Sequence, residues 1–270
     1  MKFKTIKPPY QLELLKTKGL TNDLFLVNKH FFLKQSKDIL QPFLNLTNQI
    51  NVIKLIESKK FTLPINEVNI NNNKLLTLMP YYHNLITLSE QVINKQILEQ
   101  ISLLIKQLHK IKFDNKSLIK TWKGLEQLNL YCNLTTSNPC LEKIANEVIK
   151  WITTYQPITI VLSHNDLTLN NFVKKNNCWY LIDWDFACWN DELFDIASFA
   201  SESLTSETEI NIWFNCFNLN NEQIAITKKW MIYQNLIWYY WACYLYEQTN
   251  LNIYKEISES KLTNLLKSVI

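Results

Sequence analysis

One stretch of this sequence, residues 162–200, restricts its possible folds more than any other. Two short apolar or β-rich runs, Phe172–Lys175 and Cys178–Ile182, are separated by Asn176-Asn177. Asparagine tolerates the left-handed backbone conformation that a tight turn needs, so this pattern predicts a β-hairpin. Because a hairpin folds the chain back on itself, side chains that follow its second strand return beside the loop that precedes its first strand.

Polar side chains flank the predicted hairpin on both sides. His164, Asp166 and Asn171 precede it, and Asp183 and Asp185 follow it. Transfer of a γ-phosphoryl group needs a residue that orients the attacking hydroxyl and accepts its proton, and ligands that hold Mg²⁺ against the triphosphate. Asp166 can take the first role. Asn171 and Asp183 offer the oxygen atoms that a hard cation prefers, with Asp185 as a further candidate. The order of these residues indicates phosphoryl-transfer chemistry, with His164 bracing the loop by hydrogen bonding.

The same residues resemble those of a known superfamily. The loop His164-x-Asp166-x-x-x-x-Asn171 and the following segment Ile182–Asp185 are similar to the motifs of the choline kinase and aminoglycoside phosphotransferase superfamily. These segments look most like those of bacterial choline kinases and their thiamine kinase relatives. The resemblance implies an α+β, protein-kinase-like fold of two lobes, a small β-rich N-lobe and a larger helical C-lobe, and it implies ATP and Mg²⁺ as cofactors.

Site roles follow from this resemblance. It implies that Asp166 is the catalytic Asp and that Asn171 and Asp183 bind magnesium. Asp185 stands where choline kinases usually carry Glu, which is one methylene longer. The resemblance also implies that Asp195 stabilises the catalytic loop. Asp195 could instead be the N-cap of a helix over residues 196–204, and the two roles are compatible.

The N-terminal region predicts a nucleotide-binding lid. A helical segment is expected at Tyr10–Leu15, followed by a polar turn and two strands, Leu24–Val27 and Phe31–Lys34. A polar turn before two strands can offer backbone N–H groups and hydroxyl donors to phosphates. Its residues Thr21 and Asn22 belong to a Gly-Leu-Thr-Asn sequence that resembles the phosphate loop of choline kinases.

Lys34 closes the second of these strands. It matches the position at which the superfamily places a Lys or Arg against the α- and β-phosphates. The alternative interpretation is a solvated lysine at the end of a strand. Kinase folds normally pair this lysine with a Glu on the next helix. The expected helix Pro42–Glu57 has Asn45, Asn48 and Gln49 in its first half and no acid there. Either an amide takes the place of the acid, or the match is out of register.

The remaining elements complete the two-lobe expectation. A strand pair is expected at Leu63–Val68 and Lys74–Met79, joined by Asn71-Asn72-Asn73, and a break follows at Met79–Tyr82. We therefore predict a nucleotide-binding lobe over residues 1–80 and a catalytic and acceptor-binding lobe over residues 81–270. In addition to the hairpin and the helix over residues 196–204, apolar periodicity and turn signals predict one further strand and six further helices in the second lobe, namely Ile158–Leu162 and Glu90–Lys110, Lys123–Cys132, Leu141–Thr153, Glu207–Phe217, Asn221–Glu247 and Asn252–Ser268.

Aromatic residues on one late helix indicate the acceptor. Trp238 and Trp241 lie three residues apart and so share a helix face, which can hold a quaternary ammonium by cation–π attraction. They resemble the choline cage of choline kinases, although aromatic stripes on helices are more often part of a core. Trp189 and Glu202 fall at positions where the family brings groups to the substrate side.

Several acceptors remain open at this stage. Choline ranks first, and thiamine, another cationic alcohol that aromatic rings can stack against, ranks second. Ethanolamine and an aminoglycoside rank below these two. An aminoglycoside would need an acidic acceptor surface, whereas the late helices offer mostly aromatic residues. A hypothesis of another class is a catalytically silent kinase fold that acts as a binding module.

The composition excludes other functional classes. Of the 270 residues, 47% are hydrophobic and 19% are charged, which is typical of a globular protein. A net charge of +4 without clusters gives no argument for nucleic-acid binding. Six scattered cysteines favour reduced thiols in a cytoplasmic protein. We expect neither a signal peptide nor membrane insertion, since the apolar stretch Leu236–Tyr246 is far shorter than the roughly 20 residues of a membrane span. The sequence leaves the oligomeric state open.

Overall fold

The computed structural model describes residues 3–15, 19–112, 118–136 and 138–268. Its internal contacts divide the chain into two compact units. The first unit comprises residues 1–92, 115–120 and 169–188, and the second comprises residues 93–114, 121–168 and 189–270. Asn171, Asp183 and Asp185 therefore belong to the unit of the N-terminal strands, and Asp166 belongs to the helical unit. The lobe boundary at residue 80 stays a prediction.

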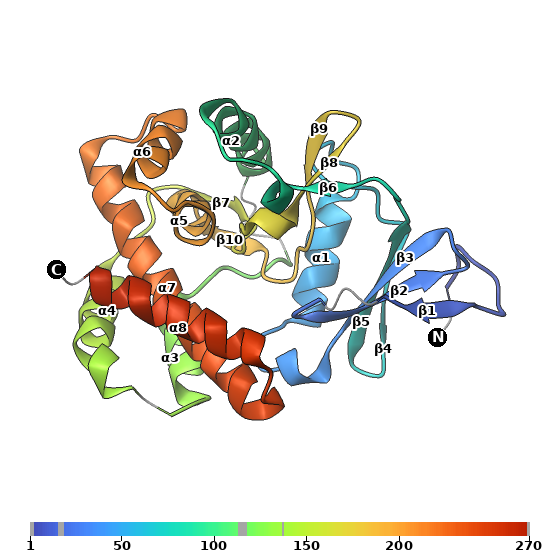
Figure 1. Ribbon diagram of the computed structural model, residues 1–270, viewed down its shortest axis with the longest axis horizontal. Helices are drawn as coiled ribbons and strands as arrows, with labels where there is room; N and C mark the ends of the chain where they lie inside the picture. Colours follow the sequence, from blue (N-terminus) through green and yellow to red (C-terminus); the bar gives the residue numbers. More distant parts are fainter. Residues whose placement is uncertain (1–2, 16–18, 113–117, 137, 269–270) are drawn as a thin grey trace. The chain divides into compact units, whose positions relative to one another are not determined.

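The first unit is built on a five-stranded antiparallel sheet in the order β1-β2-β3-β5-β4 (Figure 1). Its strands are β1 (Leu12–Leu14), β2 (Asn22–Val27), β3 (Phe31–Ser36), β4 (Glu67–Asn71) and β5 (Lys74–Pro80). Helix α1 (Leu46–Ile56) follows β3, after a 3₁₀ turn η1 (Asp38–Leu40). Asn72 and Asn73, between β4 and β5, have φ of 51° and 58°. Asparagine thus supplies the left-handed turn conformation in a chain with only two glycines.

A second, three-stranded antiparallel sheet in this unit has the order β6-β8-β9. Its strands are β6 (Ile86–Thr87), β8 (Phe172–Lys175) and β9 (Cys178–Leu181), and two 3₁₀ turns, η2 (Leu88–Glu90) and η4 (Leu169–Asn171), accompany them. Strands β8 and β9 form the predicted hairpin. Asn176 and Asn177 have φ of 49° and 62°, as a two-residue turn of this kind requires. The prediction of the hairpin is confirmed.

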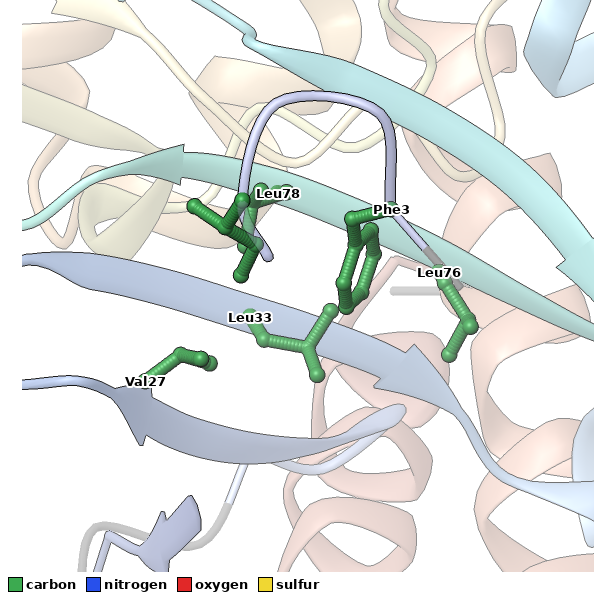
Figure 2. Packing of buried hydrophobic residues seen from close by; sticks show 6 residues of the cluster. Phe3, Val27, Leu33, Leu76 and Leu78 are labelled. Carbon is green, nitrogen blue, oxygen red and sulfur yellow. The ribbon is translucent and has the colours of Figure 1, made fainter. Parts of the chain in front are cut away.

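Apolar side chains on one face of the five-stranded sheet form the core of this part of the unit (Figure 2). Leu33 of β3 and Leu78 of β5 are paired across adjacent strands and are fully buried. The cluster also contains Phe3, Ile6, Val27 and Leu76. Burial of each such side chain stabilises the fold by roughly 1.5–3 kcal/mol. This core holds in place β2 and β3, the strands that carry Asn22 and Lys34.

The second unit is mainly helical (Figure 1). Its helices are α2 (Lys95–His109), α3 (Gly124–Asn133), α4 (Glu142–Thr154), α5 (Glu192–Ser203), α6 (Glu207–Cys216), α7 (Asn221–Thr249) and α8 (Asn252–Lys267), with a 3₁₀ turn η3 (Pro139–Leu141). Strands β7 (Ile160–Ser163) and β10 (Cys188–Asp191) pair in a small two-stranded sheet. Helix α7 packs against both α5 and α8. Within the ranges described, no helix is both long enough and apolar enough to cross a membrane.

Three local predictions are wrong. The segment Tyr10–Leu15 is not helical, because its residues Leu12–Leu14 form β1 on the edge of β2; so short a helix would be marginal by itself. The strand expected at Leu63–Val68 begins only at Glu67. Helix α5 begins four residues earlier than predicted, and its N-cap is Asp191, whose side chain accepts a hydrogen bond from the Leu193 N–H. Asp195 therefore lies inside the helix and is not its N-cap.

Candidate active site

In the first unit, two carboxylates converge on one lysine. Lys34 Nζ, on β3, lies 2.5 Å from Asp183 Oδ1 and 2.7 Å from Asp185 Oδ1, both in the segment after β9. The Lys34 side chain is 12% exposed and that of Asp185 is 5% exposed, so this is a largely buried ion-pair cluster. Asp183 has a φ of 67°, a conformation that few residues other than Gly, Asn and Asp adopt. The backbone turn at Asp183 directs the segment past the lysine.

The charges of this cluster shift the pKa values of its members. Burial alone would lower the pKa of Lys34, but the negative charges of Asp183 and Asp185 outweigh it and the pKa is raised. Burial and the neighbouring charge of Asp183 raise the pKa of Asp185, and Lys34 opposes both effects. Lys34 is thus held as an ammonium. Its positive charge contacts both carboxylates and offsets the repulsion between Asp183 and Asp185.

Thr21 and Asn22 join the same cluster. Asn22 Nδ2 donates to Asp185 Oδ2 over 2.8 Å and to Thr21 Oγ1 over 2.7 Å. Asn22 is 3% exposed. The structure therefore brings the predicted phosphate-loop residues to Asp185, and Asn22 orients that carboxylate.

Amides of helix α1 stand where kinase folds usually carry an acid. Gln49 Nε2 donates to the backbone oxygen of Asp185 over 3.0 Å, and Asn48 Nδ2 donates to the backbone oxygen of Ala187 over 2.9 Å. These amides fix the backbone of the aspartate segment, while Lys34 obtains its carboxylate partners from that segment. Lys34 therefore has two carboxylate partners although helix α1 offers it no Glu.

Lys34, Asp183 and Asp185 line a pocket within the first unit. Its other walls are mostly apolar and include Leu63, Ile65, Leu75, Met79 and Ile182. A pocket lined by apolar side chains and a few charged groups suits a ligand that has both a flat apolar part and an anionic part.

Asn171, the last residue of η4, lies beside the segment that carries these aspartates. Its backbone oxygen accepts a hydrogen bond of 3.0 Å from the Ile182 N–H, one residue before Asp183. The hairpin therefore brings Asn171 next to Asp183, as predicted. An amide oxygen and two carboxylates are hard oxygen donors of the kind that Mg²⁺ prefers, so the donor set fits this metal.

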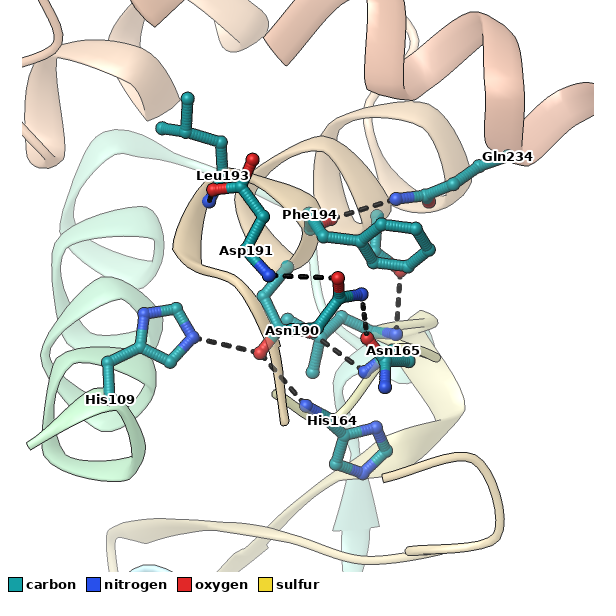
Figure 3. Close-up of polar contacts among 11 residues, drawn as sticks. His109, His164, Asn165, Asn190, Asp191, Leu193, Phe194 and Gln234 are labelled. Carbon is teal, nitrogen blue, oxygen red and sulfur yellow. Dashed lines mark hydrogen bonds and ion pairs between the residues drawn. The ribbon is translucent and has the colours of Figure 1, made fainter. Parts of the chain in front are cut away.

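In the second unit, Asp195 contacts His109, His164 and Asn165, which are labelled in Figure 3, and so organises the loop that carries Asp166. Its carboxylate accepts hydrogen bonds from the backbone N–H groups of His164, at 2.9 Å, and Asn165, at 2.8 Å. His109 Nε2, at the end of α2, lies 2.9 Å from the same carboxylate. Asp195 and His164 are fully buried. Three groups thus converge on one carboxylate inside the unit.

The residues on both sides of Asp166 are held on α5 and β10. The Leu167 N–H donates to Ser198 Oγ over 3.0 Å, and Asn190 Nδ2 donates to Asn165 Oδ1 over 2.8 Å. Asn165 itself has a φ of 65°. Because its two neighbours are fixed in this way, the backbone of half-buried Asp166 is fixed as well.

The electrostatics of the second unit agree with this arrangement. Burial alone would raise the pKa of Asp195, but the hydrogen bond and charge of His109, together with His164, lower it below its usual range. The pKa of Tyr131 on α3 is raised by burial and, in addition, by the negative charge of Asp166.

The aromatic residues of α7 are largely buried. Trp238 and Trp241 are 7% and 6% exposed, and their rings meet edge to face with centroids 5.8 Å apart. The ring centroid of Tyr131 on α3 lies 6.2 Å from that of Trp238, and the ring centroid of Tyr254 on α8 lies 5.7 Å from that of Trp241. The predicted pair thus belongs to a four-ring cluster, named below the α7 ring cluster.

The last two predicted substrate residues lie in different surroundings. Trp189 on β10 is 1% exposed, and its backbone oxygen accepts from the Trp122 N–H over 2.7 Å, so it is part of the core. Glu202 near the end of α5 forms an ion pair with Lys261 of α8. Neither the pairing of Lys261 with Glu202 nor that of His109 with Asp195 is predicted from the sequence.

A comparison with known families matches residues 17–235 to the choline/ethanolamine kinase family. The chain belongs to this family. All the residues of the Lys34 cluster and of the Asp166 loop fall inside the matched range, whereas Trp238 and Trp241 lie just beyond it.

The chain is also similar to curated proteins and to solved structures. The protein LicA homolog of Metamycoplasma hominis is 29% identical over 140 residues, which cover 50% of this chain and 53% of that protein. The crystal structure of choline kinase LicA from Streptococcus pneumoniae has a TM-score of 0.73 at 20% identity and covers 94% of this chain and 93% of its own. A LicA structure in complex with AMP has a TM-score of 0.78 at 18% identity and covers 97% and 94%. This confirms the protein-kinase-like fold. The chain spans about half the length of the first curated relatives that it matches.

Proposed function

We propose that this member of the choline/ethanolamine kinase family transfers the γ-phosphoryl group of ATP to the hydroxyl of a small cationic alcohol, with choline as the first candidate. The observation that carries the proposal is the family match over residues 17–235, which spans both the Lys34 cluster and the Asp166 loop. The likeness to the choline kinase LicA of Streptococcus pneumoniae supports choline as the acceptor.

The nucleotide is assigned to the first unit. Lys34 is a buried ammonium with two acidic partners, and it can exchange part of that contact for the α- and β-phosphates of ATP. The apolar walls of the adjoining pocket suit the adenine ring. Thr21 and Asn22 supply hydrogen-bond donors near Asp185. The likeness to a LicA structure in complex with AMP supports this assignment.

Magnesium would be held by Asn171 and Asp183, with Asp185 as a further ligand. When bound, the metal neutralises charge that develops on the phosphate oxygens. The protein contributes the orientation of the ligands: Asn22 and Gln49 hold Asp185 through its side chain and its backbone. Lys34 compensates the carboxylates from the other side.

The acceptor hydroxyl is assigned to Asp166. A carboxylate can accept the hydroxyl proton and orient the oxygen for in-line attack. Asp195 and Ser198 hold the backbone of the loop on both sides of Asp166. His164 takes part through its backbone N–H, and we assign it a positioning role.

Thiamine remains the second candidate acceptor and ethanolamine the third. The hypothesis of a silent binding module depended on the absent helix Glu. Because Lys34 has two carboxylate partners, that absence removes no ion pair, and the hypothesis loses its main support.

The test is ATP consumption with Mg²⁺ in the presence of choline, thiamine, ethanolamine or kanamycin. We expect the highest kcat/KM with choline, since aromatic rings favour a quaternary ammonium. A higher value with thiamine would move the assignment to that acceptor. ATP binding without turnover of any of the four would contradict the proposal and favour a binding module.

If Trp241 contacts the acceptor, Trp241→Ala should change the KM for choline and not the KM for ATP. Loss of one cation–π partner, worth roughly 0.5–2 kcal/mol, should raise the KM for choline by about 2- to 30-fold and leave the KM for ATP nearly unchanged. Steady-state kinetics with each substrate varied in turn measures this. Trp179→Ala, on strand β9 of the first unit, is the control for loss of a buried indole. Equal changes in both KM values would show that Trp241 serves only the core.

A further inference from the structure

A buried threonine of the first unit contacts the strand that leads to the two aspartates. Thr62 lies between α1 and β4 and is 5% exposed. It pairs with Leu181, the last residue of β9, in an isolated parallel bridge. The Leu181 N–H donates to the backbone oxygen of Phe61 over 2.8 Å. The stretch around Thr62 is therefore attached to the end of β9, two residues before Asp183.

The hydroxyl of Thr62 connects this strand end to the residue between the two aspartates. Thr62 Oγ1 donates to the Leu181 backbone oxygen over 3.2 Å, and it accepts a hydrogen bond of 3.1 Å from Trp184 Nε1. A hydroxyl has one hydrogen and two lone pairs, so it can serve both partners at once. Trp184 is 5% exposed, and its ring centroid lies 5.9 Å from that of Phe61. The indole is therefore held by a hydrogen bond and by a ring contact.

The backbone of Asp183 needs support from its neighbours. Its φ of 67° lies in the left-handed region, which is unfavourable for a residue other than glycine and persists only where the surrounding structure imposes it. On one side, the Ile182 N–H donates to the Asn171 backbone oxygen over 3.0 Å. On the other side, the next residue is Trp184, whose indole donates to Thr62. The turn at Asp183 is thus held through both of its flanking residues.

Asp185 depends less on this contact than Asp183 does. The Asp185 carboxylate contacts Lys34 and Asn22, and its backbone oxygen accepts a hydrogen bond from Gln49. Among the residues that the structure describes, Lys34 is the one polar partner of the Asp183 carboxylate, whose side chain is 29% exposed. The direction of the Asp183 side chain therefore depends on its backbone turn.

We propose that Thr62 is a positioning residue for the metal: through the indole of Trp184 it holds Asp183 in the conformation that binds Mg²⁺. The inference rests on the proposed function, which assigns Asp183 as a metal ligand. Loss of a group that orients a metal ligand typically lowers metal affinity by about 10- to 100-fold. Because Thr62 acts through a neighbouring residue, we expect a loss at the lower end of this range.

Thr62→Val tests the proposal, because it removes the hydroxyl and keeps the shape of the side chain. The probe is Mn²⁺ alone, which prefers oxygen ligands as Mg²⁺ does, and the electron paramagnetic resonance signal of free Mn²⁺ reports its binding without turnover. We expect the Kd for Mn²⁺ to rise by about tenfold. Asp183→Asn, which should abolish this binding, identifies the site. The Kd for ADP without metal should stay close to that of the wild type, because Lys34 is untouched.

Three further variants separate positioning from a general loss of packing. Thr62→Ser keeps the hydroxyl and should restore a Kd for Mn²⁺ close to that of the wild type. Trp184→Phe removes the N–H group of the same hydrogen bond and should weaken Mn²⁺ binding as Thr62→Val does. Thr227→Val is the matched control and should leave the Kd unchanged, since this fully buried hydroxyl donates to the Gln223 backbone oxygen within α7 of the second unit.

The double variant, Thr62→Val with Trp184→Phe, shows whether the two groups act together. Mn²⁺ binding should be no weaker than in the single variants, because each of them already removes the shared hydrogen bond. Losses that add in the double variant would overturn the proposal. An unchanged Kd in the single variants, or a loss in Thr62→Ser as large as in Thr62→Val, would overturn it as well. If Thr62→Val does not fold, Trp184→Phe decides by itself.

Turnover measured in the same variants distinguishes this failure from a failure of the proposed function. With ATP and choline saturating, the free Mg²⁺ concentration for half-maximal rate should rise by about tenfold in Thr62→Val. If Mn²⁺ binding weakens as expected while ATP consumption is absent throughout, the role of Thr62 stands and the kinase activity fails. If choline is phosphorylated and neither metal measurement changes, the kinase activity stands and the role of Thr62 fails.

Discussion

Replacing Asp166 by Asn is expected to lower kcat by about 10²- to 10⁴-fold, the contribution typical of a positioned general base. An amide of the same shape can still accept a hydrogen bond from the acceptor hydroxyl, but it cannot take up the proton. The KM values for ATP and choline should change little, because the Lys34 cluster and the α7 ring cluster are untouched. Steady-state consumption of ATP under saturating substrates measures the effect.

The control for this variant is Asp38→Asn, the same chemical change at a carboxylate that is 63% exposed and pairs with Lys74. It should retain wild-type kcat. Thermal unfolding of both variants should stay close to wild type, since the Asp166 loop is held by its neighbours Asn165 and Leu167. Activity that persists in a folded Asp166→Asn protein would show that another group accepts the proton.

The parts of the site that could be predicted from sequence are those encoded within a few residues. The hairpin follows from Asn176-Asn177, because a turn of positive φ is a local property of the chain. That turn is enough to bring Asn171 beside the segment of Asp183. The expectation that Asp195 stabilises the catalytic loop came from resemblance, and the hydrogen bonds to His164 and Asn165 give it a physical basis.

What sequence could not provide are pairings between distant segments. Lys34 meets Asp183 and Asp185 across about 150 positions of the chain, and no local pattern specifies which carboxylates replace the absent helix acid. The predicted start of α5 is wrong for a related reason. Asp191 and Asp195 are both acceptable N-caps by residue type, and only the packing of α5 decides between them.

The wrong predictions for the two edge strands of the five-stranded sheet, β1 and β4, have the same origin. Segment Leu12–Leu14 forms a strand because β2 offers it unpaired backbone groups. Likewise β4 starts at Glu67 because its register with β5, in which Asn71 pairs with Lys74, sets where pairing begins. Propensity within a short window contains neither partner.

Replacing Asp195 by Ala is expected to lower the free energy of unfolding by about 3–5 kcal/mol, the usual cost of removing one partner from a buried charged network. Asp195 is fully buried, and its loss leaves the N–H groups of His164 and Asn165 and the ring of His109 without their acceptor. Urea unfolding at pH 7 measures this change. Asp38→Ala, at an exposed ion pair, should cost about 0–1 kcal/mol.

The pH dependence of this difference tests whether the Asp195 charge is responsible. The pKa of Asp195 is lowered in the folded protein, so its stabilisation is fully present above the ordinary value of about 3.9 and is lost as pH falls through the folded pKa. The gap between wild type and Asp195→Ala should therefore be constant near neutral pH and narrow in acid. A gap that stays the same down to the acid limit of folding would assign the loss to packing, and the buried carboxylate would then hold the Asp166 loop by shape rather than by charge.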